Sequence, residues 1–256
     1  MKKRIKYVIL KKQNNGIKNG APRHFLLKGI LMSILYRDKN IVVVSKPAGI
    51  PSQSDLSGDE DIMKITAKEL SETGEKDNLW LVHRLDRTVG GLMVFARNKN
   101  SAASLSAIVG SKDFEKEYLA VLDGKAEGGF LSDYVYKDSK KGKAFVAKGE
   151  RRGVKLAELE YCAISSIETP HGTKTLVRVK LYTGRFHQIR VQFSSRGIPL
   201  CGDGKYGSRD NKAKMPSLFA FRLSFDMNGK RIENKKLPDL HEYPWSLFGI
   251  EELENL

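Results

Sequence analysis

Short apolar runs that end at glycine or proline turns constrain this chain more than any other feature of its sequence. Ile41–Val44 precedes the turn Lys46-Pro47-Ala48-Gly49, and Tyr118–Leu122 precedes Asp123-Gly124. Runs of this length, bounded by turn formers, are typical of buried β-strands. The same argument predicts further strands at Leu92–Ala96, 156–163, 176–181 and Leu218–Phe225.

Helical patterns are fewer. One is predicted over Ala102–Ile108, with Gly110 as its end, and another over Phe186–Arg196, with Gly197 as its cap. The acidic triplet 59–61 resembles the first turn of a third, amphipathic helix. Because strands outnumber helices and do not alternate strictly with them, we predict an α+β fold. We expect a single domain with a central mixed, largely antiparallel sheet that is flanked by helices.

Basic charge is concentrated at the N-terminus. The 256 residues include 45 Lys and Arg against 30 Asp and Glu, a net charge of +15, which favours a polyanionic partner such as nucleic acid. Residues 1–31 hold nine of the basic residues and no acid, so residues 32–256 have a net charge of only +6. We predict a flexible arm over 1–31, either a solvated tail or an RNA-binding arm, and a folded domain over 32–256.

A second basic segment lies inside the folded part. Residues 137–155 hold eight Lys and Arg against Asp138 and Glu150, with glycines that favour short strands joined by turns. A solvated hairpin face and a phosphate-binding surface are both open for this segment.

Several classes of protein and site are disfavoured. No apolar run approaches the roughly 20 residues that cross a bilayer, and Lys11 and Lys12 interrupt the N-terminal apolar run before it could serve as a signal peptide. The two cysteines, Cys162 and Cys201, are too few for a disulfide framework. The five histidines show no metal-ligand spacing, and no phosphate-binding P-loop is present. We therefore expect a cytoplasmic protein that needs neither a metal nor a cofactor.

The segment 81–92 is the first candidate for chemistry. It sets Asp86 between Arg84 and Arg87 and runs through Gly90-Gly91 into an apolar strand. The flanking cations could hold the carboxylate ionised on a tight bend. A structural aspartate in a surface ion pair is the ordinary alternative.

The segment 181–193 is the second candidate. A strand ends at Thr183-Gly184, and a cation, an imidazole and an amide follow at 185–188. On a helix, Arg190 would share a face with Phe186 and His187.

Together these residues resemble the RluA-type pseudouridine synthases. The resemblance rests on ordered motifs that span about residues 33–225, and these motifs are Lys46-Pro47-Ala48-Gly49, His83-Arg84-Leu85-Asp86, Gly91-Leu92, Lys116-Glu117-Tyr118, Thr183-Gly184-Arg185, His187-Gln188-Ile189-Arg190, Gly202-Asp203 and Tyr206-Gly207. The chain departs from the family pattern at Val89-Gly90, at Gln192 and at Phe219, where the family more often has Ser-Gly, His and His.

The resemblance implies that residues 32–256 form a catalytic domain that isomerises uridine to pseudouridine in ribosomal or transfer RNA. It implies that Asp86 is the catalytic carboxylate, which either attacks C1′ or removes the C2′ proton. Tyr118 would lie against the uracil, Arg190 would pair with Asp86, and Arg84 would contact RNA near a flipped nucleotide. We expect RNA as the partner, a monomer, and no obligate protein partner.

Two other functions are weighed against this one. An RNA-binding protein without activity would not need a carboxylate beside an arginine. A hydrolase that releases the base would ordinarily use a pair of carboxylates, whereas this chain offers one candidate.

Overall fold

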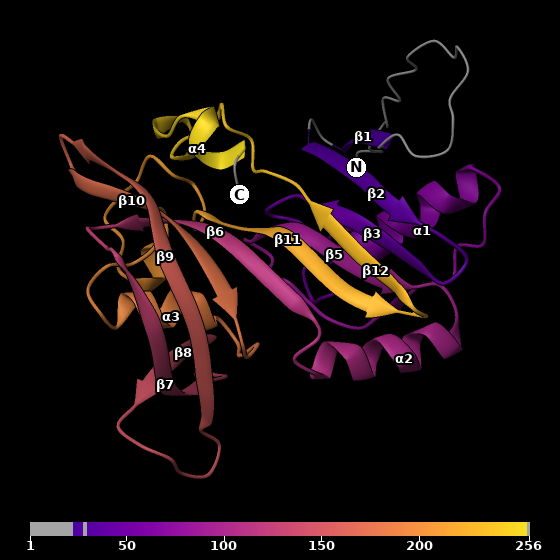
Figure 1. Cartoon of the computed structure of the whole chain (residues 1–256), viewed down its shortest axis with the longest axis horizontal. Helices are drawn as coiled ribbons and strands as arrows, with labels where there is room; N and C mark the ends of the chain where they lie inside the picture. Colours follow the sequence, from indigo (N-terminus) through magenta and orange to yellow (C-terminus); the bar gives the residue numbers. More distant parts are fainter. Residues whose placement is uncertain (1–22, 28–29, 255–256) are drawn as a thin grey trace. The chain divides into compact units, whose positions relative to one another are not determined.

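The computed structural model describes residues 23–27 and 30–254. In chain order, its elements are β1 (Arg23–Leu27), β2 (Ile30–Arg37), β3 (Ile41–Lys46), α1 (Ile62–Glu72), β4 (Trp80–Leu81), β5 (Gly90–Ala96), α2 (Lys99–Gly110), β6 (Glu115–Asp123), β7 (Gly128–Asp138), β8 (Lys143–Ala147), β9 (Lys155–Thr169), β10 (Gly172–Leu181), α3 (Gln188–Ser194), η1 (Gly204–Tyr206), β11 (Leu218–Met227), β12 (Lys230–Lys235), η2 (Trp245–Leu247) and α4 (Ile250–Glu254) (Figure 1). The predicted α+β fold with a large, mostly antiparallel sheet and flanking helices is confirmed.

The first of two compact units comprises the described residues up to Phe114, together with residues 224–236. Within this unit the strands follow the order β1-β2-β3-β5. Strand β4 pairs with the C-terminal end of β5, and β12 pairs with β11. Every residue of β3 and of β5 is buried. Their near-continuous apolar sequence is therefore the signature of strands covered on both faces.

The second unit comprises residues 115–223 and 237–256, and its strands follow the order β6-β10-β9-β7-β8. Two buried apolar clusters hold it together. One joins β6 and β10 to the C-terminal segment through Trp245 and Phe248. The other packs the β7–β8 hairpin against α3 and η1, with Val135 and Ala144 meeting Val191 and Tyr206.

Polar side chains begin the two longest helices. Asp61 accepts a hydrogen bond from the backbone N–H of Lys64, and Asn98 accepts one from Ser101. Each of these N-cap bonds satisfies a backbone donor that the helix cannot. Within residues 30–254, no helix has the length and apolar character that crossing a membrane requires.

Helix α3 begins two residues later than the sequence predicts. His187 has a φ of 53°, in the left-handed region, so the helical hydrogen-bonding pattern starts only at Gln188. The helix ends before Gly197, which has a φ of 76°. Glycine is favoured in that conformation because it has no Cβ.

The predicted arm over residues 1–31 falls largely outside the described residues. Strand β1 lies within it and pairs with β2, with Arg23 opposite Ile34 and Leu27 opposite Ile30. The division of the chain into an arm and a domain over 32–256 stays a prediction.

A lysine is buried at the end of β3. Lys46 has no exposed surface, and its Nζ donates hydrogen bonds to the backbone oxygens of Pro47 (3.0 Å), Ile50 (2.7 Å) and Arg87 (3.2 Å). Burial lowers the pKa of Lys46 to about 7, while the Asp86 carboxylate raises it and the Arg87 guanidinium lowers it further. The hydrogen bonds of this side chain therefore tie residues 46–50 to the segment that contains Asp86.

Replacing Lys46 with Met is expected to change how stability depends on pH. Between about pH 7 and pH 10 the unfolded chain holds a proton on Lys46 that the native state lacks, so the wild-type free energy of unfolding should rise with pH, by at most about 1.4 kcal/mol per pH unit from this group. In Lys46→Met this contribution disappears. Urea unfolding at several pH values measures the slope. Lys68→Met, at an exposed position on α1, serves as the control and should keep the wild-type slope.

Two glycines with the same backbone conformation have different surroundings. Gly202 (φ 75°) would place a Cβ 2.4 Å from the backbone oxygen of Met215 and 2.7 Å from the Cβ of Ala213. Gly197 (φ 76°) has no atom within 4 Å of that position.

Gly202→Ala should therefore destabilise the protein more than Gly197→Ala does. Both substitutions incur roughly 1–2 kcal/mol from the left-handed backbone. Gly202→Ala adds a steric cost of roughly 1–3 kcal/mol, because backbone atoms must move. Chemical denaturation measures the difference, and equal losses would contradict the steric argument.

Candidate functional site

Asp86 lies on a tight turn between two antiparallel strands. Leu81 of β4 pairs with Phe95 of β5, and the intervening segment folds back through a hydrogen bond from Val89 N to Asp86 O of 3.0 Å. Leu85 is buried next to the half-buried Asp86.

Ser52 anchors the backbone beside Asp86. Its hydroxyl donates to Leu85 O (2.7 Å) and lies 3.2 Å from Leu85 N, which donates to it. Gly49 N and Lys46 Nζ both donate to Arg87 O. The residues on each side of Asp86 are thus hydrogen-bonded to the segment 46–52, which limits the positions that the carboxylate can take.

The two arginines that flank Asp86 differ in their surroundings. Arg87 donates to Ser57 and forms ion pairs with Asp55 and Asp59. Arg84 is exposed, and within residues 30–254 no hydrogen bond or ion pair engages it. Arg87 therefore holds the 55–59 loop, whereas Arg84 is available to a ligand.

His83 supports the same turn. Its Nε2 accepts a hydrogen bond of 3.0 Å from Val94 N in β5, and its ring meets Phe114 edge to face, with 5.3 Å between the ring centroids. As an acceptor, Nε2 is unprotonated, so this histidine has a structural role in the site.

In the second unit, Tyr118 lies near the start of β6. It is 6 % exposed and pairs with Val179 of β10. Its neighbour Glu117 is buried and forms ion pairs with Arg222 (2.6 Å) and Arg178 (3.7 Å). Burial lowers the pKa of Lys116, on the other side of Glu117. The Lys-Glu-Tyr motif is therefore a set of buried or partly buried groups on one strand.

Gln188 shapes the turn between β10 and α3. Its Oε1 accepts from the Thr183 hydroxyl (2.8 Å) and from Arg185 N (3.0 Å), and its Nε2 donates to Glu158 O (3.0 Å). Arg185 donates from Nε to Leu156 O at 2.8 Å. The polar residues that follow Thr183-Gly184 thus fix the start of the helix that presents Arg190.

Arg190 and Asp203 form a buried bidentate ion pair. Nε lies 2.6 Å from Oδ2 and Nη2 lies 2.8 Å from Oδ1, with the two residues 4 % and 1 % exposed. The ring of Tyr206 lies below the guanidinium, 5.0 Å from Cζ. The planar guanidinium group suits Arg to such a buried pair. The third nitrogen of the group, Nη1, does not contact Asp203 in this pair.

These positions account for the predicted site residues as follows. Asp86 and Arg84 share one turn of the first unit, and Tyr118 and Arg190 lie on β6 and α3 of the second. The expected pairing of Arg190 with Asp86 stays a prediction.

Sequence reasoning gave no role to Lys46, Ser52 or Asp203. The available signal for Lys46 was a lysine within two residues of the apolar run 41–44, a position where a buried lysine needs hydrogen-bond partners. Gln192, where the family more often has His, is buried and donates to Asp133 (2.8 Å) and to Ala157 O (3.1 Å). These bonds satisfy the amide nitrogen of Gln192, whereas its Oε1 is buried without a hydrogen-bond partner among the described residues.

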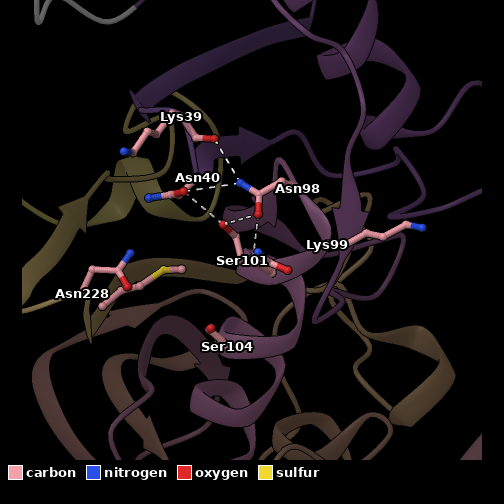
Figure 2. Close-up of a pocket in the computed structure, with 9 residues that line it drawn as sticks. Lys39, Asn40, Asn98, Lys99, Ser101, Ser104 and Asn228 are labelled. Atoms are coloured by element: carbon pink, nitrogen blue, oxygen red, sulfur yellow. Dashed lines mark hydrogen bonds between the residues drawn. The ribbon is translucent and has the colours of Figure 1, made fainter.

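A polar pocket of about 500 Å³ lies at the start of α2 (Figure 2). Asn98 donates to Lys39 O (3.3 Å) and to Asn40 Oδ1 (3.4 Å), and Ser101 donates to the side-chain oxygens of both asparagines. These bonds tie α2 to the β2–β3 turn. None of the predicted site residues lines this pocket, and its hydrogen bonds have a structural role.

Comparison with known proteins identifies the family. A family model described as RNA pseudouridylate synthase matches residues 40–195. An uncharacterized RNA pseudouridine synthase of Aquifex aeolicus is 33 % identical in an alignment of 242 positions that covers 89 % of this chain and 71 % of that protein. The ribosomal large subunit pseudouridine synthase D of Borreliella burgdorferi is 28 % identical over 84 % of this chain and 66 % of its own length.

A solved structure supports the fold. The human RNA pseudouridylate synthase domain containing 1 matches with a TM-score of 0.71 and 22 % identity, over 88 % of this chain and 93 % of that chain. This likeness concerns the fold alone. The family match and the relatives go further: the chain belongs to the RNA pseudouridylate synthase family, is of the RluA type, and is an isomerase that acts on RNA.

Proposed function

We propose that this enzyme isomerises specific uridines in structured RNA, with Asp86 as the catalytic carboxylate and without a cofactor. The observation that carries the proposal is the anchoring of Asp86. Its turn is hydrogen-bonded on both sides to the segment 46–52, and its negative charge raises the pKa of the buried Lys46. A carboxylate that must meet a sugar carbon with defined geometry benefits from such a fixed backbone.

The reaction balances without an added reagent. The C1′–N1 bond breaks, the uracil turns, a C1′–C5 bond forms, and the proton on C5 is lost while N1 gains one. Substrate and product are isomers, so no electrons are supplied or removed. What the protein must supply is an anionic group at the ribose, a surface for the detached base, and exclusion of water.

Asp86 is proposed to act in its ionised form, either by attack on C1′ or by removal of the C2′ proton. Arg190 would pair with it. The salt bridge with Asp203 uses Nε and Nη2, so a second carboxylate would meet the guanidinium through Nη1. Tyr118 would stack on the uracil. Arg84, exposed beside Asp86, would contact the RNA next to the flipped nucleotide.

Ribosomal and transfer RNA are the proposed substrates. The name of the Borreliella relative refers to the large ribosomal subunit, which makes large-subunit ribosomal RNA the first substrate to test. We propose that the enzyme acts as a monomer in the cytoplasm, where these RNAs are found.

Asp86→Asn is expected to lower turnover by roughly 10⁴-fold or more, because it removes the anionic oxygen while it keeps the shape of the side chain. RNA affinity should stay within a few-fold of wild type. Since C5 loses its proton, release of tritium from RNA labelled at uridine C5 measures turnover, and nucleoside chromatography identifies pseudouridine.

Asp77→Asn is the matched control, because Asp77 is an exposed carboxylate of the same unit. It should retain wild-type turnover. Substantial pseudouridine formation by pure Asp86→Asn protein would exclude Asp86 as the catalytic group. Free uracil as the main wild-type product would instead favour a hydrolase.

Substitutions of Tyr118 separate the ring from the hydroxyl. Tyr118→Phe keeps the ring and should be close to wild type. Tyr118→Ala should lose roughly 1–3 kcal/mol of stacking, a 5- to 150-fold loss of kcat/KM. Because Tyr118 is buried, Tyr118→Leu controls for lost volume, and thermal unfolding is measured for all three. Equal losses for Phe and Ala would show that the hydroxyl is needed.

A further inference from the structure

We propose that Lys137, Lys143 and Lys205 form a cationic cluster that binds phosphates of the RNA backbone. The cluster lies wholly within the second unit, where the β7–β8 hairpin packs against α3 and η1. Figure 1 shows β7 and β8 beside α3. The inference rests on the proposed function in one respect, which is that the polyanion is the RNA substrate.

Three aromatic rings hold the cluster together. Phe186 and His187 stack with 3.8 Å between their centroids, and Tyr206 meets the ring of His187 edge to face at 5.6 Å. The Tyr206 oxygen accepts a hydrogen bond of 2.7 Å from Ala144 N on β8, and it lies 3.0 Å from His187 Nδ1. These contacts therefore join the β7–β8 hairpin to the turn before α3 and to the short helix η1.

Each lysine reaches this point from a different element. The Nζ of Lys137, near the end of β7, lies 4.5 Å from the centre of the Phe186 ring. The Nζ of Lys143, the first residue of β8, lies 4.8 Å from the centre of the Tyr206 ring. The Nζ of Lys205, in η1, approaches the hairpin turn and lies 3.5 Å from where a Cβ on Gly142 would be.

No carboxylate neutralises these ammonium groups within residues 30–254. Asp138 is the cross-strand partner of Lys143, but its Oδ1 accepts from the backbone of Lys141 and it forms no ion pair. Asp203 is bound by Arg190 through both oxygens.

Other cations of the same unit do have carboxylate partners. Lys174 bridges Asp123 and Asp210, and Arg196 pairs with Asp133. Like charges that converge without a counter-charge repel each other, so the arrangement is stabilised by a bound anion.

The state of His187 agrees with a positive local potential. Burial, together with the positive charges of Arg190, Lys205 and Lys137, lowers its pKa to about 3. The imidazole is therefore neutral at physiological pH. Because the oxygen of Tyr206 already accepts a hydrogen bond from Ala144 N, the Tyr206 hydroxyl is placed to donate to His187 Nδ1. His187 also has a left-handed backbone, a strained conformation that is concentrated at functional sites.

The chemistry of the cluster favours backbone phosphates over bases. Lysine contacts phosphate as a compact charge and has no fixed donor geometry with which to recognise one base. Phosphate contacts position a nucleic acid and do not read its sequence. The cluster should therefore contribute to affinity and to its salt dependence for any RNA that reaches the site.

The test replaces all three lysines with Gln and compares this variant with a matched one. The matched variant carries Lys140→Gln, Lys148→Gln and Arg152→Gln, which remove the same charge from exposed positions of the same basic segment, outside the ring cluster. KM, kcat and the Kd for RNA are measured from 50 to 300 mM salt. A third variant, with Arg at 137, 143 and 205, restores the charge.

The cluster variant should show a KM roughly tenfold higher near physiological salt, and the slope of log Kd against log salt should fall by about 2. The loss should lie in KM rather than in kcat. The matched variant should change KM less than about threefold, and the Arg variant should recover most of the affinity. Thermal unfolding establishes that each variant folds.

A cluster variant that behaves like the matched variant in KM and in salt slope would overturn the inference, as would a loss confined to kcat. The proposed function fails separately. If the wild type binds RNA with a salt slope that depends on these lysines and yet converts no uridine, the phosphate site stands and the synthase activity does not. If conversion is normal and the slope is insensitive to the cluster, the activity stands and the phosphate site does not.

Discussion

The cost of removing a cation from water dictates the geometry on both units of this protein. A buried cation persists only where protein groups replace its hydration. Lys46 meets this condition only in part, because three backbone oxygens accept from it and burial still lowers its pKa to about 7. Arg190 meets it with both oxygens of Asp203. One acceptor of Lys46, Arg87 O, lies one residue after Asp86, and Arg190 is itself a predicted site residue.

This constraint limits the movement of the turn that contains Asp86 and of the Arg190 side chain. Arg87 O, one residue after Asp86, accepts from Lys46 and from Gly49, so the turn cannot move without breaking hydrogen bonds of a buried side chain and of the backbone. Arg190 lies between Asp203 and the ring of Tyr206, which fixes the direction of its guanidinium. Groups held in this way need little reorganisation during a reaction, which is the main contribution a protein scaffold makes to catalysis.

Paired and unpaired cations have different roles in the second unit. Arg178, Arg222 and Lys174 have carboxylate partners and stabilise strands β6, β10 and β11. The lysines around Phe186, His187 and Tyr206 have none within the part of the chain that the structure describes. Net charge alone does not distinguish these two groups, and the +15 of the whole chain therefore says little about where RNA would bind.

Much of the fold could be predicted from local patterns. The apolar run 41–44 lies in β3, and the helix expected over 102–108 lies in α2, which ends at Gly110 as the sequence indicates. The start of α3 could not be predicted, because the left-handed backbone of His187 interrupts a helical apolar pattern. Around this residue, Gln188 bonds to Thr183 and to Glu158 O in β9, and His187 contacts Tyr206. Glu158 and Tyr206 are distant from the helix start in sequence, so their contacts leave no local signal.

The sequence by itself determined the family and the α+β class and is the source of the proposed roles of Asp86, Tyr118 and Arg190, since ordered motifs and apolar periodicity are local properties of the chain. The tertiary structure decided which charges are satisfied: Lys46 by backbone oxygens, Arg190 by Asp203, and Arg87 by the loop 55–59. It also brought together Lys137, Lys143 and Lys205. The physical reason is that the energy of a charge depends on its solvation and its neighbours, which folding alone determines.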